Sequence, residues 1–162
     1  MHTPDPHAAG QDPATGRELA RTLGLEALPE EGGLFRRTHF DGHSSAIYFM
    51  LLAPEFSALH RLPSTEVYHW YAGAPLRLLL LHPDGRAEEP VLGPDIAAGQ
   101  RPQIPVPPGV WQGSSSAGGW SLCGTTMAPP FGWEGFELCG AQHGLGTRYP
   151  EWAERIAKLT RD

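Results

Sequence analysis

The chain is poor in cysteine and has no long apolar run. Its two cysteines, Cys123 and Cys139, do not have the spacing of a C-x-x-C pair, which leaves a zinc ribbon or a thioredoxin-like centre unsupported. We interpret them as buried, reduced thiols. The longest apolar run, Ala46 to Ala53, is far too short to span a bilayer. The chain does not open with a basic segment followed by an apolar one, so no signal peptide is expected.

Clustered basic residues are also scarce. The chain has 12 Lys and Arg against 18 Asp and Glu, for a formal net charge of −6. Nucleic-acid surfaces neutralise phosphates with grouped Lys and Arg, and the pair Arg36-Arg37 with a few scattered residues near the C-terminus is too little. We therefore expect a cytoplasmic protein that has neither a nucleic acid nor a membrane as its partner.

What is abundant is glycine and proline. With 162 residues, 20 Gly, 17 Pro, 40% hydrophobic and 19% charged residues, the chain fits one globular domain of short strands and tight turns. Residues 1–14 contain three prolines and no branched aliphatic or aromatic residue, which predicts a flexible tail. A single domain over residues 15–162 follows from this.

Each end of this domain has a helix signal. Thr15 and Glu18 have the spacing of a capping box, so a helix of about ten residues is expected from Thr15 to the residue before Gly24. Pro150 opens a second helix, because proline suits a first helical turn. One apolar stripe on that helix is formed by Trp152, Ile156 and Leu159.

Between the helices the composition favours strands. Aromatic, Leu, Ile and Thr residues bounded by Gly or Pro predict strands at Ser45–Ala53, Phe56–Arg61, Thr65–Ala72, Pro75–Leu81 and Gly119–Ala128. His82–Gly85 is expected to be the turn to an antiparallel partner around Glu88–Leu92. The prolines of Gln100–Gly109 place that segment at a sheet edge or in a loop, and Gly113–Ala117 is interpreted as a turn. The pattern is that of a β-sandwich or small barrel.

One predicted strand carries polar residues that need an explanation. Alternation over Thr65–Gly73 puts Glu66 and Tyr68 on one face, together with Trp70. The opposite face has Val67, His69 and Tyr71, and we expect both faces to be covered. Glu66 then points inward, where a carboxylate needs a metal, a cation or hydrogen-bond donors.

Two interpretations of this carboxylate stay open. His60, at the end of the preceding strand, can lie beside Glu66, and the two would be ligands suited to Zn, Fe, Mn or Ni. Alternatively, Glu66 is a satisfied buried group that pairs with Arg36, Arg61 or His60. An H-x5-E spacing alone is a weak metal signal.

Further polar and aromatic residues follow later in the chain. The turn at Pro107–Gly109 leads into a strand on which Gln112 faces the interior, where its amide can bind a substrate or weakly ligate a metal. The segment Glu31–Gly33 has no phosphate-loop lysine after it, so phosphate binding there is not expected. Three aromatic residues are interpreted as part of a lid, a core or a pocket wall: Phe131, Trp133 and Phe136.

The order of these motifs resembles that of a known superfamily. His60, Glu66 and Gly73, followed by Pro107-x-Gly109, resemble the two motifs of the cupin superfamily, H-x-H-x3-4-E-x6-G and P-x-G-x2-H. More narrowly, the chain resembles a cupin branch labelled predicted sugar epimerases. The pieces that carry this resemblance, within residues 17 to 160, are Glu31–Arg36, Ser44–Phe49, His60–Arg61, Ser64–Tyr68, Leu92–Gly93, Pro107–Gln112, Ala128–Phe131 and Gly135–Leu138.

The resemblance implies a fold and a location for the site. The fold is an all-β double-stranded β-helix (a jelly-roll barrel), commonly dimeric, with the ligand pocket inside the barrel mouth; a homodimer is therefore expected. Two of the superfamily's metal ligands are replaced, because the second histidine of the first motif falls on Leu62 and the histidine of the second motif falls on Gln112. His60 and Glu66 remain, with Gln112 as a weak third ligand.

Three functional hypotheses follow, of which we favour the first. In it, the barrel binds a small polar metabolite such as a sugar, with no claim of turnover. The pocket would be formed by His60, Glu66 and Tyr68 together with Arg36, Tyr48, Trp70, Trp111, Gln112 and Phe131.

The other two hypotheses are enzymatic. The second is a metal-independent epimerase, similar to cupin dTDP-sugar epimerases, with His60 as the base, Glu66 as its orienting partner and Tyr68 or Tyr48 as the acid. The third is a metal-dependent dioxygenase or isomerase that uses one divalent Zn, Fe, Mn or Ni ion on His60, Glu66 and Gln112.

Overall fold

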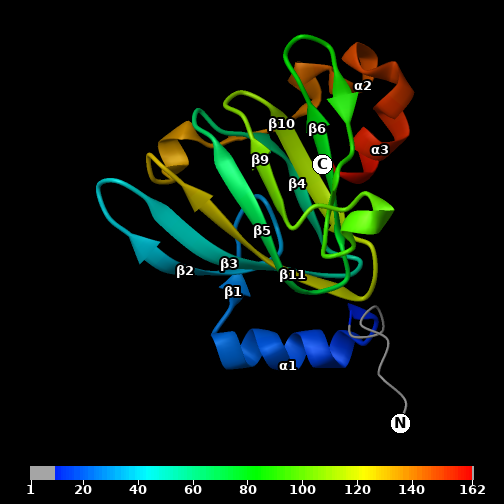
Figure 1. Ribbon diagram of the computed structural model, residues 1–162. Coiled ribbons are helices and arrows are strands. Elements are labelled where there is room, and N and C mark those ends of the chain that lie inside the picture. The colour runs from blue at the N-terminus through cyan, green and yellow to red at the C-terminus, as the bar shows by residue number, and fades with distance from the viewer. Residues whose placement is uncertain (1–9, 162) are drawn as a thin grey trace.

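Two antiparallel sheets face each other in the computed structural model, which describes residues 10–161 (Figure 1). The first sheet, here called sheet A, has the strand order β1-β2-β3-β11-β5-β9. Its strands are β1 (Glu26–Ala27), β2 (Leu34–Phe40), β3 (Ser45–Leu52), β11 (Trp120–Met127), β5 (Glu66–Gly73) and β9 (Gln103–Val106).

The second sheet, sheet B, has the order β12-β4-β10-β6-β7, and β8 also pairs with β6. Its strands are β12 (Glu137–Leu138), β4 (Phe56–Arg61), β10 (Trp111–Ser116), β6 (Leu76–Leu81), β7 (Ala87–Glu88) and β8 (Val91–Leu92). The helices are α1 (Pro13–Leu23), α2 (Leu145–Arg148) and α3 (Ala153–Lys158), with 3-10 turns η2 (Ile96–Ala98), η3 (Trp133–Gly135), η4 (Ala141–His143) and η5 (Pro150–Trp152).

Sheet B is buried on both faces, which explains its leucine-rich strand β6. Side chains alternate along a strand, so Leu78 and Leu80 enter the core between the sheets while Leu79 and Leu81 pack on the other face. That other face is covered by the C-terminal helices through Leu145, Ile156 and Leu159. The expected apolar stripe of the last helix is thus confirmed as its packing face.

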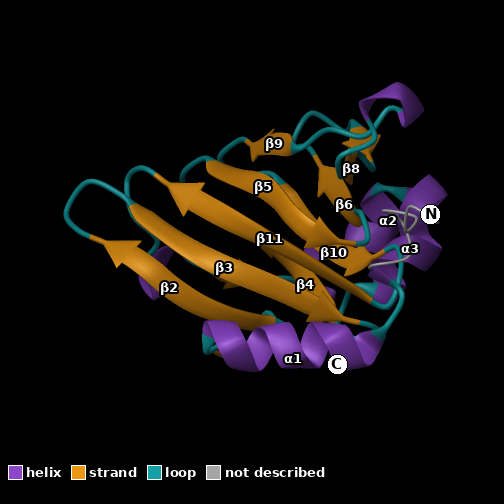
Figure 2. Cartoon of the chain, turned by 60° about the horizontal axis from the view of Figure 1, so that its bottom comes forward, coloured by secondary structure: helices purple, strands orange, loops and turns teal. Residues whose placement is uncertain are grey.

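Sheet A is covered on its outer face only in part. Helix α1 packs Ala20 against Met50, Trp120 and Leu122, but it spans only part of the sheet (Figure 2). Beyond the helix, Tyr71 is 47% exposed on β5. The expectation that both faces of this strand are covered is therefore wrong at its outer face, because α1 packs on β3 and β11 and leaves Tyr71 of β5 uncovered.

The start of α1 differs from the expectation. The N-cap is Asp12, whose carboxylate accepts hydrogen bonds from the backbone N–H of Ala14 and the hydroxyl of Thr15, so Thr15 is not the cap. The expected end is confirmed, since Gly24 caps the helix at a φ of +67°. Of the tail expected over residues 1–14, residues 1–9 lie outside the described residues, whereas Gly10 O accepts a hydrogen bond from Gly119 N.

Several sequence predictions can be compared with the strands. The turn at His82–Gly85 and its antiparallel partners are confirmed, and the proline-containing β9 is an edge strand as expected. The interpretation of Gly113–Ala117 as a turn is wrong, because Gly113 to Ser116 continue β10. That strand pairs with β4 on one side and β6 on the other, and pairing on both sides outweighs the weak strand preference of Gly and Ser.

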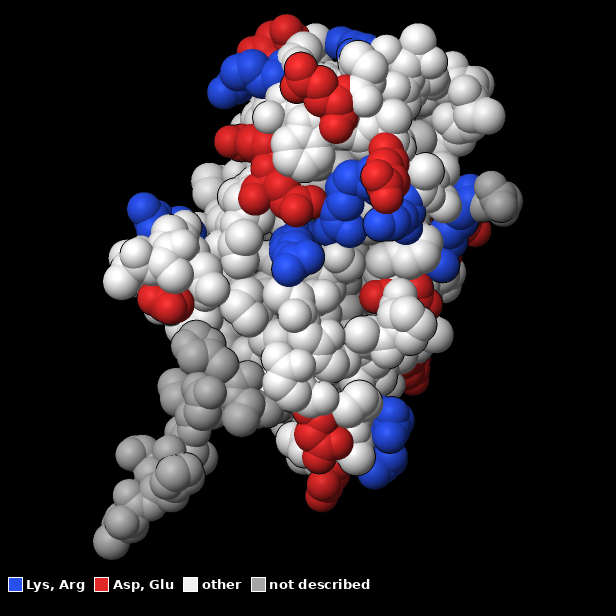
Figure 3. Space-filling model, turned by 90° about the vertical axis from the view of Figure 1, so that its right-hand side faces the viewer, with Lys and Arg blue, Asp and Glu red and all other residues white. Residues whose placement is uncertain are grey.

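The architecture as a whole matches the expected class: an all-β jelly roll with helices at both ends of the chain (Figure 1). On the face shown in Figure 3, acidic and basic side chains lie next to each other in the upper part, above a mostly uncharged region. Arg155 Nε lies 2.6 Å from Glu89 Oε2. Within residues 10–161, none of the helices is long and apolar enough to cross a bilayer.

Candidate functional site

A cavity of about 790 Å³ opens between the β2–β3 hairpin and the segment around η3. In Figure 1 these two segments lie side by side at the left of the barrel. The buried part of the cavity wall contains the carboxyl groups of Glu31 and Glu66 with Leu62 and Thr125. The exposed part contains Arg36, Arg37, Phe40 and Trp133, and the half-buried Phe131 also lines the cavity.

Glu31 reaches the cavity from the loop between β1 and β2. Glu30, Gly32 and Gly33 all have positive φ, which turns the chain sharply around Glu31. Glu31 O accepts a hydrogen bond from Ala58 N at 2.9 Å, and its carboxylate Oε2 accepts one from Ser57 Oγ at 2.9 Å. The loop is therefore fixed to β4, and the second carboxyl oxygen of Glu31 is free to face His60.

His60 lies behind Glu31 and is only 1% exposed. Its Nδ1 is 2.7 Å from Ala58 O, and a carbonyl oxygen can only accept, so Nδ1 carries a hydrogen. Its Nε2 is 3.2 Å from Glu31 Oε1. A neutral imidazole has a lone pair at this nitrogen, so the contact is favourable only when one proton lies between His60 and Glu31.

Below about pH 7 the electrostatics place this proton on the carboxyl group. Burial raises the pKa of Glu31 to about 7, although Ser57 and Arg161 oppose the increase. Burial lowers the pKa of His60, because the charged imidazolium loses its hydration. A protonated Glu31 beside a neutral His60 satisfies both groups.

Glu66, on β5, is the second carboxyl group of the cavity. Burial raises its pKa to about 7, and the charge of Glu31 adds to this, while His60 and hydrogen bonds with Thr125 and Gln112 oppose it. Two carboxyl groups that repel each other in a low-dielectric wall do not both ionise readily. The cavity thus has a pair of acids that are poised to exchange protons near neutral pH.

Tyr68 and Gln112 form the layer beneath this pair. The hydroxyl of Tyr68 donates to Gln112 Oε1 at 2.7 Å, and both side chains are buried. Burial, with the charges of Glu66 and Glu31 adding to it, raises the pKa of Tyr68 well above its usual value. Tyr68 therefore stays a hydrogen-bond donor, which orients the Gln112 amide.

A cluster of three aromatic rings closes the cavity on the β12 side. The ring of Phe136 stacks on His60 with a centroid distance of 5.2 Å and an interplanar angle of 22°. Trp133 meets both Phe131 and Phe136 edge-to-face at 5.1 and 5.0 Å. Phe131 N donates to Ser45 Oγ at 2.9 Å, which ties this segment to β3.

Residues 17–139 match the family model described as cupin superfamily (DUF985). The chain belongs to the cupin superfamily. None of the curated proteins matches this cupin.

Solved structures support the same assignment. A structural-genomics protein from Shewanella oneidensis is 36% identical, with a TM-score of 0.81 over 89% of this cupin and 96% of that protein. A hypothetical protein from Leishmania major is 26% identical, with a TM-score of 0.80 over 90% and 98% of the two chains. Oxalate decarboxylase from Bacillus subtilis is 12% identical, with a TM-score of 0.58 over 85% of this cupin and 37% of that chain, which shows a shared fold only.

The side chains of this cupin do not fit the metal site that the resemblance implies. Within residues 10–161 no group of three or more His, Cys, Asp or Glu side chains is placed to hold a metal ion. Leu62 contributes an apolar side chain to the cavity wall where the superfamily motif has a histidine. The oxygen of Gln112, expected as a weak third ligand beside His60 and Glu66, already accepts from Tyr68. We therefore derive no step through a metal.

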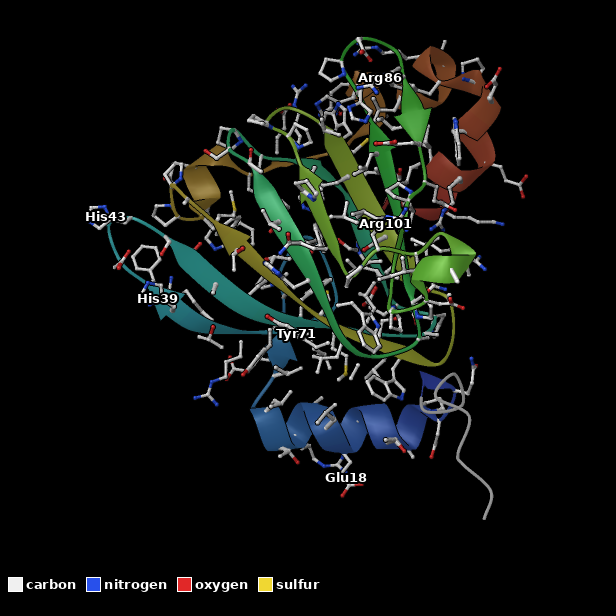
Figure 4. All side chains as sticks on the ribbon, viewed as in Figure 1. Glu18, His39, His43, Tyr71, Arg86 and Arg101 are labelled. Carbon is white, nitrogen blue, oxygen red and sulfur yellow. The ribbon has the colours of Figure 1, made fainter. Side chains whose placement is uncertain are left out.

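Of the residues expected to bind a ligand, Phe131 lines the cavity and Gln112 lies just beneath it. Arg36 borders the cavity, but its Nη1 donates to Leu23 O at the end of α1. Tyr48 lies on the outer face of sheet A, where it meets Tyr71 edge-to-face at 6.1 Å, and Figure 4 shows Tyr71 on the α1 side of this sheet.

The two expected tryptophans lie elsewhere. Trp111 faces the C-terminal helices, with Arg61 over its ring at 4.6 Å, so it is outside the cavity. Trp70 packs against the inter-sheet core and is likewise absent from the cavity wall. Both Trp111 and Trp70 therefore need to be corrected from ligand contacts to packing residues.

Glu31 and Arg37 are among the residues of the cavity wall that sequence reasoning did not assign. Glu31 belongs to the segment Glu31–Arg36, which carries part of the family resemblance, and its glycines were a usable signal of a sharp turn. Arg37 was considered only as a basic residue. Its position one residue after Arg36 on β2 directs it to the opposite face, because side chains alternate along a strand.

Proposed function

We propose that this cupin binds a small polar molecule in the cavity, with hydroxyl or carbonyl groups of the ligand held by Glu31 and Glu66. The single observation that supports this most strongly is the pair of carboxyl groups on the wall of a cavity of about 790 Å³. A cavity of this size fits a small metabolite, and mostly apolar walls with a few polar groups are typical of such sites.

Protonation suits the pair to neutral ligands with hydroxyl groups. Near a pKa of about 7, each carboxyl group can be a donor as an acid or an acceptor as a carboxylate. A hydroxyl group needs one partner of each kind. Buried polar groups are costly unless satisfied, so the pair is expected to favour a ligand that replaces lost water contacts.

The test is a thermal-shift measurement with neutral aldoses and ketoses, such as glucose and fructose. At ten times its dissociation constant, a bound sugar should raise the free energy of unfolding by about 1.4 kcal/mol, which shows as a higher Tm. Glu66→Gln and Glu31→Gln should reduce this rise, whereas Glu154→Gln, at an exposed position on α3, should leave it unchanged. If the sugar raises the Tm of the wild type and of all three variants equally, the ligand binds outside the cavity.

A second candidate, an isomerase that moves a proton, is supported by the pKa of about 7 of both carboxyl groups, since general acid–base groups work best near the operating pH. One carboxylate would remove a proton from the carbon next to a carbonyl group, and the other carboxyl would return a proton to that carbon. His60, expected from the sequence as the base, lies behind Glu31 and would hold its proton.

This candidate predicts exchange of solvent deuterium into a keto-sugar nucleotide, measured by NMR. Glu66→Gln should stop the exchange, and His60→Gln should slow it while shifting its pH profile. Equal exchange in the wild type and Glu66→Gln would exclude Glu66 as a proton-transfer group. The homodimer, the cytoplasmic location and the sugar-epimerase branch remain predictions of the sequence.

A further inference from the structure

Arg37 is a cation at the exposed end of the cavity. It lies on β2 opposite Ile47 of β3, and both residues line the cavity. Its guanidinium carbon lies 4.5 Å from the centroid of the Phe40 ring. Stacking on an aromatic face holds a guanidinium in place and leaves its N–H groups free for a ligand.

Arg37 has no acceptor for its guanidinium among residues 10–161, in contrast to three arginines that are held in ion pairs. Arg61, Arg155 and Arg161 form ion pairs with Glu137, Glu89 and Glu55, respectively. Among residues 10–161, no carboxylate lies within 4.0 Å of the Arg37 guanidinium, and no hydrogen bond of its side chain is found. Glu26 also lines the cavity, but it forms no ion pair with Arg37.

Two large exposed aromatic residues line the same cavity as this cation. Phe40 is 52% exposed and Trp133 is 47% exposed, and both belong to the cavity wall. Large apolar side chains with this much exposure are few in residues 10–161; the others are Tyr71 and Ile96. Edge-to-face contacts with Phe131 and Phe136 fix the Trp133 ring, so its exposed surface is ready to stack on a flat partner.

The cavity therefore has two chemically different ends. Glu31 and Glu66 are at the buried end, and Arg37 with Phe40 and Trp133 is at the exposed end. We propose that the ligand is a ring-bearing anion, whose carboxylate or phosphate pairs with Arg37, whose ring packs on Trp133, and whose polar groups reach Glu31 and Glu66. This inference rests on the proposed function for the buried end of the cavity.

The chemistry of the guanidinium sets the ligand class. Arginine presents parallel N–H donors that match both carboxylate and phosphate oxygens. An anionic group at the buried end would meet the charge of the two carboxyl groups, whereas at the exposed end it meets Arg37 and water. The polarity of the cavity thus orients the ligand with its anionic group outward.

The test compares probes that share one ring and differ in charge: glucose, glucuronate and glucose 6-phosphate, with inorganic phosphate alone as a fourth. Dissociation constants are measured by isothermal titration calorimetry at pH 7. The anionic sugars should bind at least about tenfold more tightly than glucose, as expected for one hydrogen-bonded charge pair. The comparison of glucuronate with glucose 6-phosphate tells whether carboxylate or phosphate is preferred.

Three variants assign the effect to Arg37. Arg37→Met retains an unbranched stem for packing on Phe40 and should abolish the preference for anions, while Arg37→Lys should keep part of it. Arg101→Met is the matched control, because Arg101 lies on a different part of the barrel from His39 and the β2–β3 hairpin (Figure 4). It should leave all affinities unchanged.

Outcomes that overturn the inference are distinct from those that overturn the proposed function. Equal binding of glucose and both anions in the wild type, no binding of any probe, or an anion preference that survives Arg37→Met would contradict the inference. Glucose binding that is lost in Glu66→Gln, without an anion preference, would support the proposed function alone. An anion preference that needs Arg37 but not Glu31 or Glu66 would support the anion site and contradict the proposed function.

Discussion

His60 Nε2, on strand β4 of sheet B, lies 3.2 Å from Glu31 Oε1 in the loop that precedes β2. The other imidazole nitrogen is already committed to Ala58 O. Histidine is thus a support for the carboxyl group in this cupin, rather than the group that faces the cavity.

Titration of the carboxyl groups should show the raised pKa values of Glu31 and Glu66 directly. In an NMR titration of the side-chain carboxyl carbons, two glutamates should titrate with apparent pKa values of about 7, because burial disfavours their charged forms. Glu137, whose pKa is lowered by hydrogen bonds from Arg61 and His143, should titrate below its usual range. Removing the charge of Glu31 as Glu31→Gln should lower the pKa of Glu66, because that charge raises it. Titration of all glutamates below pH 5 would contradict the burial of the pair.

Stability should fall as the pH rises toward neutrality. Between about pH 4.5 and 7 the folded protein holds protons on Glu31 and Glu66 that the unfolded chain has released, so the free energy of unfolding decreases as the pH rises through this range and levels off above it. His60 has the opposite effect: its lowered pKa decreases stability only below about pH 6.5, where the unfolded histidine gains a proton. Urea unfolding at several pH values should show a free energy of unfolding that decreases with pH, and this decrease should be smaller in Glu66→Gln. If Glu66→Gln leaves the decrease unchanged, the pH dependence comes from other groups.

Replacing Gly33 should both destabilise the protein and disturb the site. Gly33 has a φ of +82°, and a Cβ atom there would lie 2.7 Å from a ring carbon of Phe49. Gly33→Ala is expected to lower the free energy of unfolding by about 1–3 kcal/mol. The control is Gly42→Ala in the β2–β3 hairpin, where no atom lies within 4 Å of the added methyl group. Urea unfolding compares the two, and similar stability would show that the Glu31 loop can relax.

Truncation of Leu80 tests the core beneath the cavity. Leu80 is 2% exposed in the cluster between the two sheets, so Leu80→Ala is expected to reduce stability by about 2–5 kcal/mol. Ile96→Ala, at a residue that is 61% exposed, should change it by less than about 0.5 kcal/mol. Thermal or urea denaturation provides the comparison. Equal effects of both substitutions would show that the inter-sheet core is not packed as described.

The local residue pattern was sufficient to predict the strands that have clear apolar residues. It failed where pairing with neighbouring strands determines whether a segment forms a strand. Alternation correctly put Glu66 and Tyr68 on the inner face of β5. The same rule shows why Trp111 and Gln112 cannot both face the cavity, since neighbours on one strand point to opposite sides. The strand formed by Gly113 and the serines after it could not be predicted locally, because its stability comes from the partners on both sides.

The sequence did not identify Glu31 as a residue of the cavity for a similar reason. Glu31 stands in a loop, and its direction depends on contacts with Ser57 and Ala58 that are distant in sequence. Periodicity gives no information about such a position. Turn glycines show that the chain bends there, whereas only the folded barrel shows what the bend faces.

The loop that presents Glu31 is also held by the last described residue of the chain. Arg161 Nη2 donates to Phe56 O at 2.8 Å and to Glu31 O at 3.3 Å, and it pairs with Glu55. This arginine lies outside residues 17–139, the segment that the family model matches. A cupin cut to its family segment would retain both carboxyl groups of the cavity but lose the cation that braces one of them. The C-terminal segment thus acts as a scaffold for the acidic pair, and extensions or fusions at that end should affect ligand binding as well as stability.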